Sequence, residues 1–239
     1  MRILALDSSA VSASVAVMED EKLVGEFFIY TKQTHSQTLM PMVKNVLDCT
    51  DIALDTIDLF AVSAGPGSFT GVRIGVSCVK GMAMAQGKPC VGVSTLEAMA
   101  FSLTDLEGIV CAVMDARRQQ VYNACFVSKG GVLTRLTEDR ALAIDDLAEE
   151  CKTFGQPIYL VGDGAALCAA SPVFQSLENV HLPAEPLRFQ RGYGVAMAAR
   201  HALERQETVD AAELAPVYLR MPQAERELKQ RLSKMEETV

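Results

Sequence analysis

The opening of the chain alternates between apolar runs and polar turns. Hydrophobic positions are continuous or recur every second residue over Arg2–Leu6, Ser12–Met18 and Leu23–Tyr30. A repeat of two is typical of β-strands, and polar clusters such as Asp7–Ser9 between the runs are typical of turns. The opening therefore predicts a meander of three strands.

After this meander the hydrophobic spacing becomes helical and then varies between helical and extended. Leu39, Val43 and Val46 recur every three to four residues, which places them on one face of a helix. The elements predicted for the rest of the first unit are a helix over Ser36–Cys49, a buried strand over Asp58–Ser63, a long helix ending near Gln86, a strand over Pro89–Val93 and a helix from Ser94 to about Thr104. The last helix opens on the pattern of a capping box.

The same order of elements returns after residue 104. Predicted there are strands over Ile109–Met114, Gln120–Val127 and Val132–Leu136, a helix over Ile144–Lys152, a strand over Pro157–Val161, a turn at Gly162–Gly164 into a short helix, and a helix over Gly192–Arg205. A duplicated strand-strand-strand-helix-strand-helix (βββαβα) order is not that of a doubly wound dinucleotide-binding fold. We therefore predict two α/β lobes, 1–104 and 105–222, and leave open whether the last helix packs back on the first lobe. A charged helical tail is predicted over 223–239.

Composition narrows the class of protein. With 49% hydrophobic residues among 239, the chain has enough apolar material for a packed core. Its net charge of -8 gives it no basic footprint for phosphate backbones, which argues against a stand-alone nucleic-acid binder. The chain has no run of about 18 apolar residues and only a short apolar start, so we expect a soluble cytoplasmic protein with no membrane partner.

Neither cysteine nor histidine spacing predicts a metal site. The seven Cys residues are odd in number and form no Cys-x-x-Cys pair, so we expect reduced thiols in the core. The three histidines, His35, His181 and His201, lack the spacing of a zinc-binding helix. We therefore predict no catalytic metal.

The glycine-rich turn at 64–71 is the first candidate for chemistry. Glycines let the backbone turn tightly, and amides at the start of the next helix can hold an anion. The Walker pattern needs Gly-Lys-Ser/Thr where this chain has Gly71–Arg73, and the dinucleotide fingerprint needs glycine where it has Thr70. Both phosphate motifs fail, and a turn that only reverses the chain remains an equal alternative.

Ser63 is a second candidate, as the nucleophile of a hydrolase. The stretch Ala61–Gly65 comes within one residue of the nucleophile elbow Gly-x-Ser-x-Gly. An elbow enters its helix directly, whereas Pro66 and Gly67 prolong the turn here, and the sequence gives no local sign of a catalytic base. A serine at a strand end is the favoured interpretation, and a serine peptidase is kept as an alternative.

Acidic turns follow the first strand of each unit, at Asp7–Ser9 and at Asp115–Arg117. In a two-lobed nucleotide-binding protein such hairpins face each other across a cleft, where they hold phosphate and Mg²⁺. Turn formation by Asp and Ser explains them equally well. The residues expected around such a nucleotide-like cleft are Asp7, Ser8, Gly65, Gly67, Ser68, Asp115, Gly162 and Gly164.

The duplicated order, the Asp7 turn and the run Ala64–Arg73 together resemble the bacterial TsaB (YeaZ) family. The likeness is strong over residues 1–104 and looser beyond. Further stretches that carry it are Thr34–Pro41, Gly92–Leu96, Met114–Arg117, Gln120–Tyr122, Val161–Gly164 and Pro216–Arg220. The resemblance implies the two-lobed, actin-like α/β fold of the sugar-kinase and chaperone-ATPase superfamily. It also implies a role in making threonylcarbamoyladenosine next to the anticodon of tRNAs that read codons beginning with A.

The resemblance further implies a non-catalytic subunit. The family's catalytic relative, TsaD, is similar in fold but has a His-x-x-x-His metal site, and Thr95 and Met99 occupy the two ligand positions here. It implies TsaD and the ATPase TsaE as partners, a homodimer when TsaD is absent, and contact with tRNA only through the complex. No cofactor is expected, although ATP or ADP at the cleft or the complex interface stays open. An ATP-dependent transferase remains the second enzymatic alternative.

In the family, two helices of the first lobe contact the partner, and here these are Ser36–Cys49 and Thr70–Gln86. Their apolar residues exceed what one stripe facing a sheet requires, so we expect the surplus to face a partner. The spacing leaves open which stripe faces outward. The residues predicted for the interface are Leu39, Met40, Val43, Val46, Leu47, Val72, Arg73, Val76 and Val79.

Overall fold

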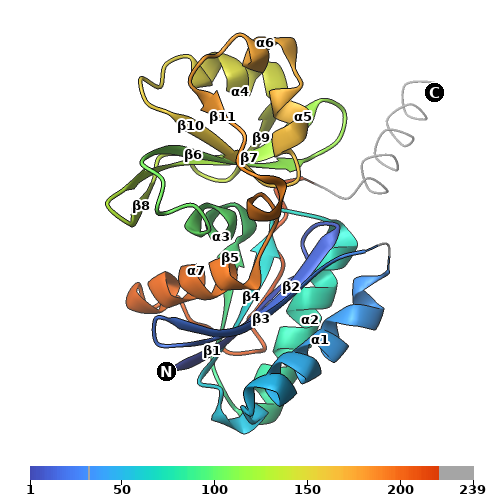
Figure 1. Cartoon of the computed structure of the whole chain (residues 1–239). Helices are drawn as coiled ribbons and strands as arrows, with labels where there is room; N and C mark the ends of the chain where they lie inside the picture. The colour runs from blue at the N-terminus through green and yellow to red at the C-terminus, as the bar shows by residue number, and fades with distance from the viewer. Residues whose placement is uncertain (32, 221–239) are drawn as a thin grey trace, which may run out of the picture.

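Two β-sheets form the frames of two lobes (Figure 1). The computed structural model describes residues 1–31 and 33–220, so the predicted tail over 223–239 lies outside the described residues. In the first lobe the sheet order is β3-β2-β1-β4-β5, and β1 pairs antiparallel with β2 and parallel with β4. Its strands are β1 (Arg2–Asp7), β2 (Ser12–Glu19), β3 (Lys22–Tyr30), β4 (Leu59–Gly65) and β5 (Cys90–Ser94).

The second sheet repeats this topology. Its order is β8-β7-β6-β10-β11, with β6 antiparallel to β7 and parallel to β10, so the predicted duplication is confirmed. The strands are β6 (Gly108–Asp115), β7 (Gln120–Lys129), β8 (Val132–Arg135), β10 (Ile158–Val161) and β11 (Val180–His181). A further strand, β9 (Arg140–Ala143), pairs with β7. Neither β9 nor β11 is predicted, because each is too short for a periodic pattern to emerge.

The central strands of the first sheet are buried on both faces, which explains their nearly continuous hydrophobic runs. Along β1, Leu4 and Leu6 belong to the core under helices α1 (His35–Thr50) and α2 (Phe69–Gln86). Ile3 belongs to the core on the opposite face, under α7 (Gly192–Glu204). The lobe is therefore a three-layer sandwich of two helices, a sheet and a further helical layer.

Helix α3 (Thr95–Phe101) lies between the two sheets. Ala98 and Phe101 pack in the core of the first sheet, whereas Leu96 and Met99 pack against the second. The outer face of the second sheet is covered by α4 (Ile144–Cys151), α5 (Ala165–Ala169) and α6 (Pro172–Gln175). Two single-turn 3₁₀ helices, η1 (Leu54–Thr56) and η2 (Glu185–Leu187), complete the described elements.

The start of α3 shows half of the predicted capping box. Ser94 Oγ accepts a hydrogen bond from the Glu97 backbone N–H at 3.2 Å. The Glu97 carboxylate does not complete the box and instead pairs with Arg135 of the second lobe at 2.9 Å. The helix ends at Phe101 rather than near Thr104.

The last helix, α7, packs on the first sheet although it follows the second lobe in the chain. Glu26 of β3 anchors it, because its carboxylate pairs with Arg191 at 2.7 Å and accepts the Tyr193 N–H at 3.2 Å. The Gly192 N–H donates to Ser14 Oγ at 2.9 Å. Helix α7 thus packs back on the first lobe, which is the arrangement that the sequence left open.

The cysteines of the structure are all free thiols. Five are buried, namely Cys90, Cys111, Cys125, Cys151 and Cys168. Cys49 is exposed and Cys78 is half-buried, so the prediction of core thiols is wrong for Cys49, which lies on the outer side of α1. None of the described helices is both long enough and apolar enough to cross a membrane.

Replacing Arg191 by alanine should lower the free energy of unfolding by about 2–4 kcal/mol, because it leaves the carboxylate of Glu26 buried and unpaired. The Glu26 side chain is only 7% exposed. Urea and thermal unfolding measure the loss. Arg200→Ala is the matched control, since its partner Glu21 is 83% exposed and such surface pairs contribute at most about 1 kcal/mol. Equal, small losses in both variants would contradict the anchoring role of Glu26.

Candidate functional site

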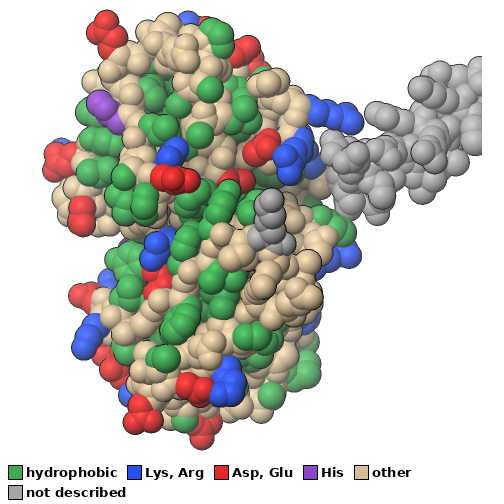
Figure 2. Space-filling model, turned by 45° about the vertical axis from the view of Figure 1, so that its right-hand side comes forward, with side chains coloured by type: hydrophobic (Ala, Val, Ile, Leu, Met, Phe, Trp, Pro, Cys, Tyr) green, Lys and Arg blue, Asp and Glu red, His purple; other side chains and the backbone are tan. Residues whose placement is uncertain are grey.

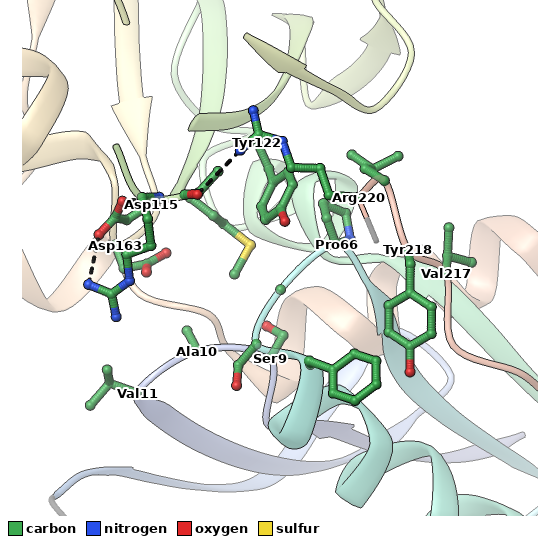
Figure 3. Close-up of a pocket in the computed structure, with 17 residues that line it drawn as sticks. Ser9, Ala10, Val11, Pro66, Asp115, Tyr122, Asp163, Val217, Tyr218 and Arg220 are labelled. Carbon is green, nitrogen blue, oxygen red and sulfur yellow. Dashed lines mark hydrogen bonds and ion pairs between the residues drawn. The ribbon is translucent and has the colours of Figure 1, made fainter. Parts of the chain in front are cut away.

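A cavity of about 350 Å³ lies between the lobes (Figure 3). The turns after β1 and β4 line it from the first lobe, at 9–11 and 66–69. The second lobe contributes the 114–117 turn together with Tyr122 and Asp163. Residues 217–220, at the end of the described chain, form a further wall. We refer to this cavity as the interlobe cavity.

The turns expected around a cleft do meet here, but most of the predicted residues do not reach the interlobe cavity. Gly67, Ser68 and Asp115 line it. The five residues that lie buried behind its walls are Asp7, Ser8, Gly65, Gly162 and Gly164. These five shape the turns, and other side chains form the inner surface.

Asp7 shows why a residue at the right turn stays out of the cavity. Its carboxylate accepts hydrogen bonds from the Ser9 backbone N–H at 2.9 Å, from Ser9 Oγ at 2.8 Å and from Ser63 Oγ. Burial raises the pKa of Asp7, although these hydrogen bonds act in the opposite direction. Asp7 thus joins the end of β1 to β4 and has no free face toward a ligand.

The backbone amides of the turns are also used within the protein. The Ser68 N–H donates to the Ser9 carbonyl oxygen at 2.6 Å. On the second lobe, the Gly162 N–H donates to the Arg188 carbonyl oxygen at 2.7 Å and the Gly164 N–H to a carbonyl oxygen of β6 at 3.2 Å. A phosphate chain in a glycine-rich turn is held mainly by free amides. These three amides are therefore not available to a phosphate.

Charged side chains of both signs line the interlobe cavity, namely Asp115 and Asp163 together with Arg117 and Arg220. Burial raises the pKa of Asp163 to about 6, although Gln190 Nε2 donates to its carboxylate at 2.9 Å. Asp115 already has a counter-ion, because the Arg117 guanidinium lies 3.3 Å from its carboxylate. The two acidic side chains of the lining are thus matched by two basic ones, so the cavity carries no excess of either charge.

Sequence reasoning missed Tyr122, Asp163 and the 217–220 wall as parts of the cavity. Asp163 stands between two glycines of a turn that the sequence does identify, and that position was the available signal. Tyr218 and Arg220 lie in the loosely matching stretch Pro216–Arg220. Their place at the cavity depends on the path of the chain after α7, which local patterns do not encode.

The serine hydrolase interpretation finds no support at Ser63. Its hydroxyl donates to the buried Asp7 carboxylate, and Ser63 itself is buried. His35 Nε2 lies 2.7 Å from the Ala10 carbonyl oxygen, while His181 and His201 stack on aromatic rings elsewhere. No hydrogen bond joins Ser63 to a histidine within the described part of the chain.

Thr95 and Met99, which the resemblance implies at the two ligand positions of TsaD, lie in the core. Thr95 and Met99 are both fully buried, and Met99 packs among the apolar residues between α3 and the second sheet. Within residues 1–31 and 33–220, no group of three or more His, Cys, Asp or Glu side chains is arranged to hold a metal ion.

Seven of the nine residues predicted for the partner interface do not reach the surface of the chain. Leu39, Val43, Val46, Leu47, Val72, Val76 and Val79 are all buried in the core of the first lobe. The apolar surplus has a physical cause, because α1 and α2 pack against each other as well as against the sheet, and each needs two adjoining apolar flanks. Of the nine, only Met40 and Arg73 reach the surface.

A different face of these helices is open. Met40 is 44% and Met84 66% exposed, and Ile74 and Cys78 are half-buried. A groove of about 490 Å³, the α1–α2 groove, is lined by Ser36, Phe69, Thr70, Arg73, Ile74, Ser77 and Cys78. Figure 2 shows hydrophobic side chains reaching the surface of the lower, first lobe between separate charged ones.

Comparisons with known proteins agree with this architecture. A family model described as "TsaD: tRNA N6-adenosine threonylcarbamoyltransferase" matches residues 29–228. The tRNA threonylcarbamoyladenosine biosynthesis protein TsaB of Bacillus subtilis is 31% identical over 234 residues, which are 94% of this chain and 96% of that protein. The protein of the same name from Escherichia coli is 40% identical over 124 residues, 51% of this chain and 53% of that protein.

Solved structures show the same likeness. YeaZ from Pseudomonas aeruginosa has a TM-score of 0.79 at 30% identity, covering 91% of this chain and 99% of that one. Two lobes with the same sheet order define a protein of the actin-like class, which includes sugar kinases and ATPases. Within this class, the chain belongs to the TsaB (YeaZ) family. The resemblance seen in the sequence is confirmed, and the family acts in tRNA threonylcarbamoyladenosine biosynthesis.

Replacing Asp163 by asparagine should stabilise the protein at pH 7–8 by about 1–3 kcal/mol. The folded-state pKa of about 6 lies above the ordinary value of 3.8, so charging Asp163 opposes folding as the pH rises through this interval. The gain should be complete above pH 6 and should shrink as the pH falls toward 4. Unfolding by urea across this range measures it.

Asp105→Asn is the matched control, because Asp105 is exposed in a turn. Its effect should be small and should not follow the same pH curve. A stabilisation by Asp163→Asn that did not change between pH 4 and pH 7 would contradict the effect of burial on Asp163.

Proposed function

We propose that this chain is a non-catalytic subunit in threonylcarbamoyladenosine formation, where it binds and supports the metal-dependent transferase TsaD together with the ATPase TsaE. tRNA then meets the chain only as part of the complex, in line with its net charge of -8. The observation that carries this proposal is that Asp7 and the amides of Ser68, Gly162 and Gly164 bond within the protein while a groove on the first lobe stays open. In this proposal the chain supports the transferase by binding it through the groove on the surface of the first lobe.

The bonding and burial of the candidate residues support a chain that has no catalytic activity of its own. Asp7 and Ser63 satisfy each other, and Thr95 and Met99 are packed in the core. Catalysis requires groups that can bond the reacting atoms, and a buried group that is already bonded cannot do so without rearrangement. Neither ATP nor a metal ion is needed by the chain itself in this proposal.

The α1–α2 groove has the chemistry of a protein contact. Its floor and rim combine half-buried apolar groups, Ile74 and Cys78, with small polar ones, Ser36 and Ser77. Apolar centres with polar rims are typical of protein interfaces. A helix pair of the partner would fill the groove and cover the exposed Met40 and Met84. The same face would serve a second copy of this chain when TsaD is absent.

Ser77→Glu should weaken binding to TsaD by at least about 100-fold and leave the melting temperature of the free chain unchanged. Ser77 is exposed in the free chain and lines the groove. The carboxylate that the substitution introduces therefore loses its water only in the complex. Calorimetry with purified TsaD measures the binding. The rate of tRNA modification by TsaD and TsaE should fall in parallel at limiting concentrations of the chain.

Two further variants control for charge and for fold. Gln175→Glu adds the same charge to the exposed surface of α6 and should bind normally. Val76→Glu places the charge in the core and should unfold the free chain. The interface would lie elsewhere if Ser77→Glu, Met40→Glu and Met84→Glu all bound TsaD like the unchanged chain. Threonylcarbamoyl transfer by the chain alone at about 1 per second or faster would contradict the non-catalytic role.

A further inference from the structure

Residues 214–220, here called the strap, cross from the first lobe to the second along the rim of the interlobe cavity. The strap begins in the core of the first lobe, where Leu214 is buried and Lys80 Nζ donates to its carbonyl oxygen at 3.0 Å. The Val217 N–H donates to the Ala64 carbonyl oxygen at 2.7 Å. The strap is therefore fixed to the end of β4 before it reaches the cavity.

The path of the strap explains the glycine at position 65. Gly65 has a φ of +133°, and a Cβ atom there would lie 2.2 Å from the carbonyl oxygen of Val217. Only glycine permits both this backbone conformation and this close approach. The glycine-rich turn thus has a role in seating the strap, in place of the phosphate contact that its composition suggests.

The middle of the strap contacts the α1–α2 groove. The Tyr218 ring lies 5.0 Å from the ring of Phe69, measured between centroids. Arg73 Nε donates to the Tyr218 hydroxyl at 2.7 Å, and the Arg73 guanidinium lies 3.9 Å from the Phe69 ring centroid. Phe69 lines both the groove and the interlobe cavity, whereas Arg73 lines the groove and Tyr218 the cavity. The groove and the cavity therefore share a wall.

The end of the strap contacts the second lobe. Arg220 Nη1 lies 3.4 Å from the Ala116 carbonyl oxygen, and Nη2 donates to Gln120 Oε1. The guanidinium also lies 6.0 Å from the centroid of the Tyr122 ring, and Figure 3 shows the two side chains next to each other. These contacts grip the β6–β7 hairpin on both sides of its tip.

The tip of this hairpin has an unusual backbone. Arg117, Arg118 and Gln119 have φ values of 67°, 56° and 58°, so three consecutive residues other than glycine are left-handed. This conformation is disfavoured for each of them and persists only where surrounding contacts hold it. Arg220 provides such contacts at Ala116 and Gln120, which flank the tip. Arg220 thus helps to hold the hairpin in its left-handed conformation.

We propose that the strap couples the α1–α2 groove to this hairpin. A partner seated in the groove fixes Arg73 and Phe69, these fix Tyr218, and the position of Tyr218 determines whether Arg220 grips the hairpin of the second lobe. The coupling rests on the proposed function for its partner, whereas the grip of Arg220 does not. Because coupling between two equilibria is reciprocal, loss of the grip must weaken partner binding by the factor by which the partner strengthens the grip.

The grip is tested first, on the full chain without a partner. Arg220→Ala should speed amide hydrogen exchange in residues 115–122 by about tenfold, the scale of one lost hydrogen bond to a charged group. Arg200→Ala is the matched control, because Arg200 pairs with Glu21 within the first lobe and should leave this exchange unchanged. Equal exchange of 115–122 in Arg220→Ala and in the unchanged chain would overturn the grip.

The coupling is tested next, with TsaD as the partner. Binding of TsaD should slow exchange in 115–122 of the unchanged chain, and Arg220→Ala should bind TsaD several-fold more weakly. Tyr218→Phe keeps the ring but loses the hydroxyl that Arg73 bonds, so TsaD should still bind but should no longer slow the exchange of 115–122.

The outcomes separate this inference from the proposed function. If TsaD bound and left the exchange of 115–122 unchanged, or if it slowed the exchange equally in Tyr218→Phe, the coupling would be wrong and the partner role would stand. If TsaD did not bind the unchanged chain at all, the proposed function and the coupling would both fail. The grip of Arg220 would still be decided by the exchange of the free chain.

Discussion

The carboxylate of Asp7 is buried at the end of β1, where only protein groups can satisfy its hydrogen bonds. Ser9 supplies an amide and a hydroxyl, and Ser63 supplies a hydroxyl from β4. The Ser9 carbonyl oxygen in turn accepts the Ser68 N–H at the start of α2. Leaving such a carboxylate unsatisfied would be costly, so this network fixes the turns around the interlobe cavity. It also uses the Ser68 amide and the Ser9 and Ser63 hydroxyls, which are therefore not available to a ligand.

Because of this constraint, the proposed function depends on contacts at the surface of the molecule and not on its cavity. The glycine-rich turn seats the strap, and the acidic hairpin of the second lobe pairs Asp115 with Arg117. Both turns lie where turns face each other in a nucleotide-binding cleft, but here they make contacts within the protein. The outer side of α1 and α2 stays open, while their inner sides form the core.

The order of the strands and helices could be predicted from the sequence because it depends on local periodicity. Strands such as β1 and β6 are continuous apolar runs, and Ser94 marks the start of α3 by its own hydrogen bond. The outward stripe of α1 and α2 could not be predicted in this way. A valine that faces a neighbouring helix and a valine that faces a partner have the same spacing, and only the packed structure distinguishes them.

The site was predictable only in part for a related reason. The turns at Asp7, Gly65 and Asp115 could be located because Asp, Ser and Gly have turn-forming chemistry. Which side chains enter the cavity depends on contacts between distant segments. Tyr218 and Arg220 reach it only because the chain returns to the first lobe at α7 and then passes the end of β4. The pKa of Asp163 depends on how far the folded chain buries it.

The central claim is that the chain supports the transferase without using its cavity. Removing the acidic charges of the cavity and measuring tRNA modification in the presence of TsaD and TsaE tests this claim most directly. At a saturating amount of the double variant Asp115→Asn, Asp163→Asn, the rate of tRNA modification by TsaD and TsaE should stay within about twofold of the rate with the unchanged chain. The reason is that neither carboxyl group contacts a reacting atom. A fall of about 100-fold or more, with the complex still formed, would contradict it and would assign the chemistry to the interlobe cavity.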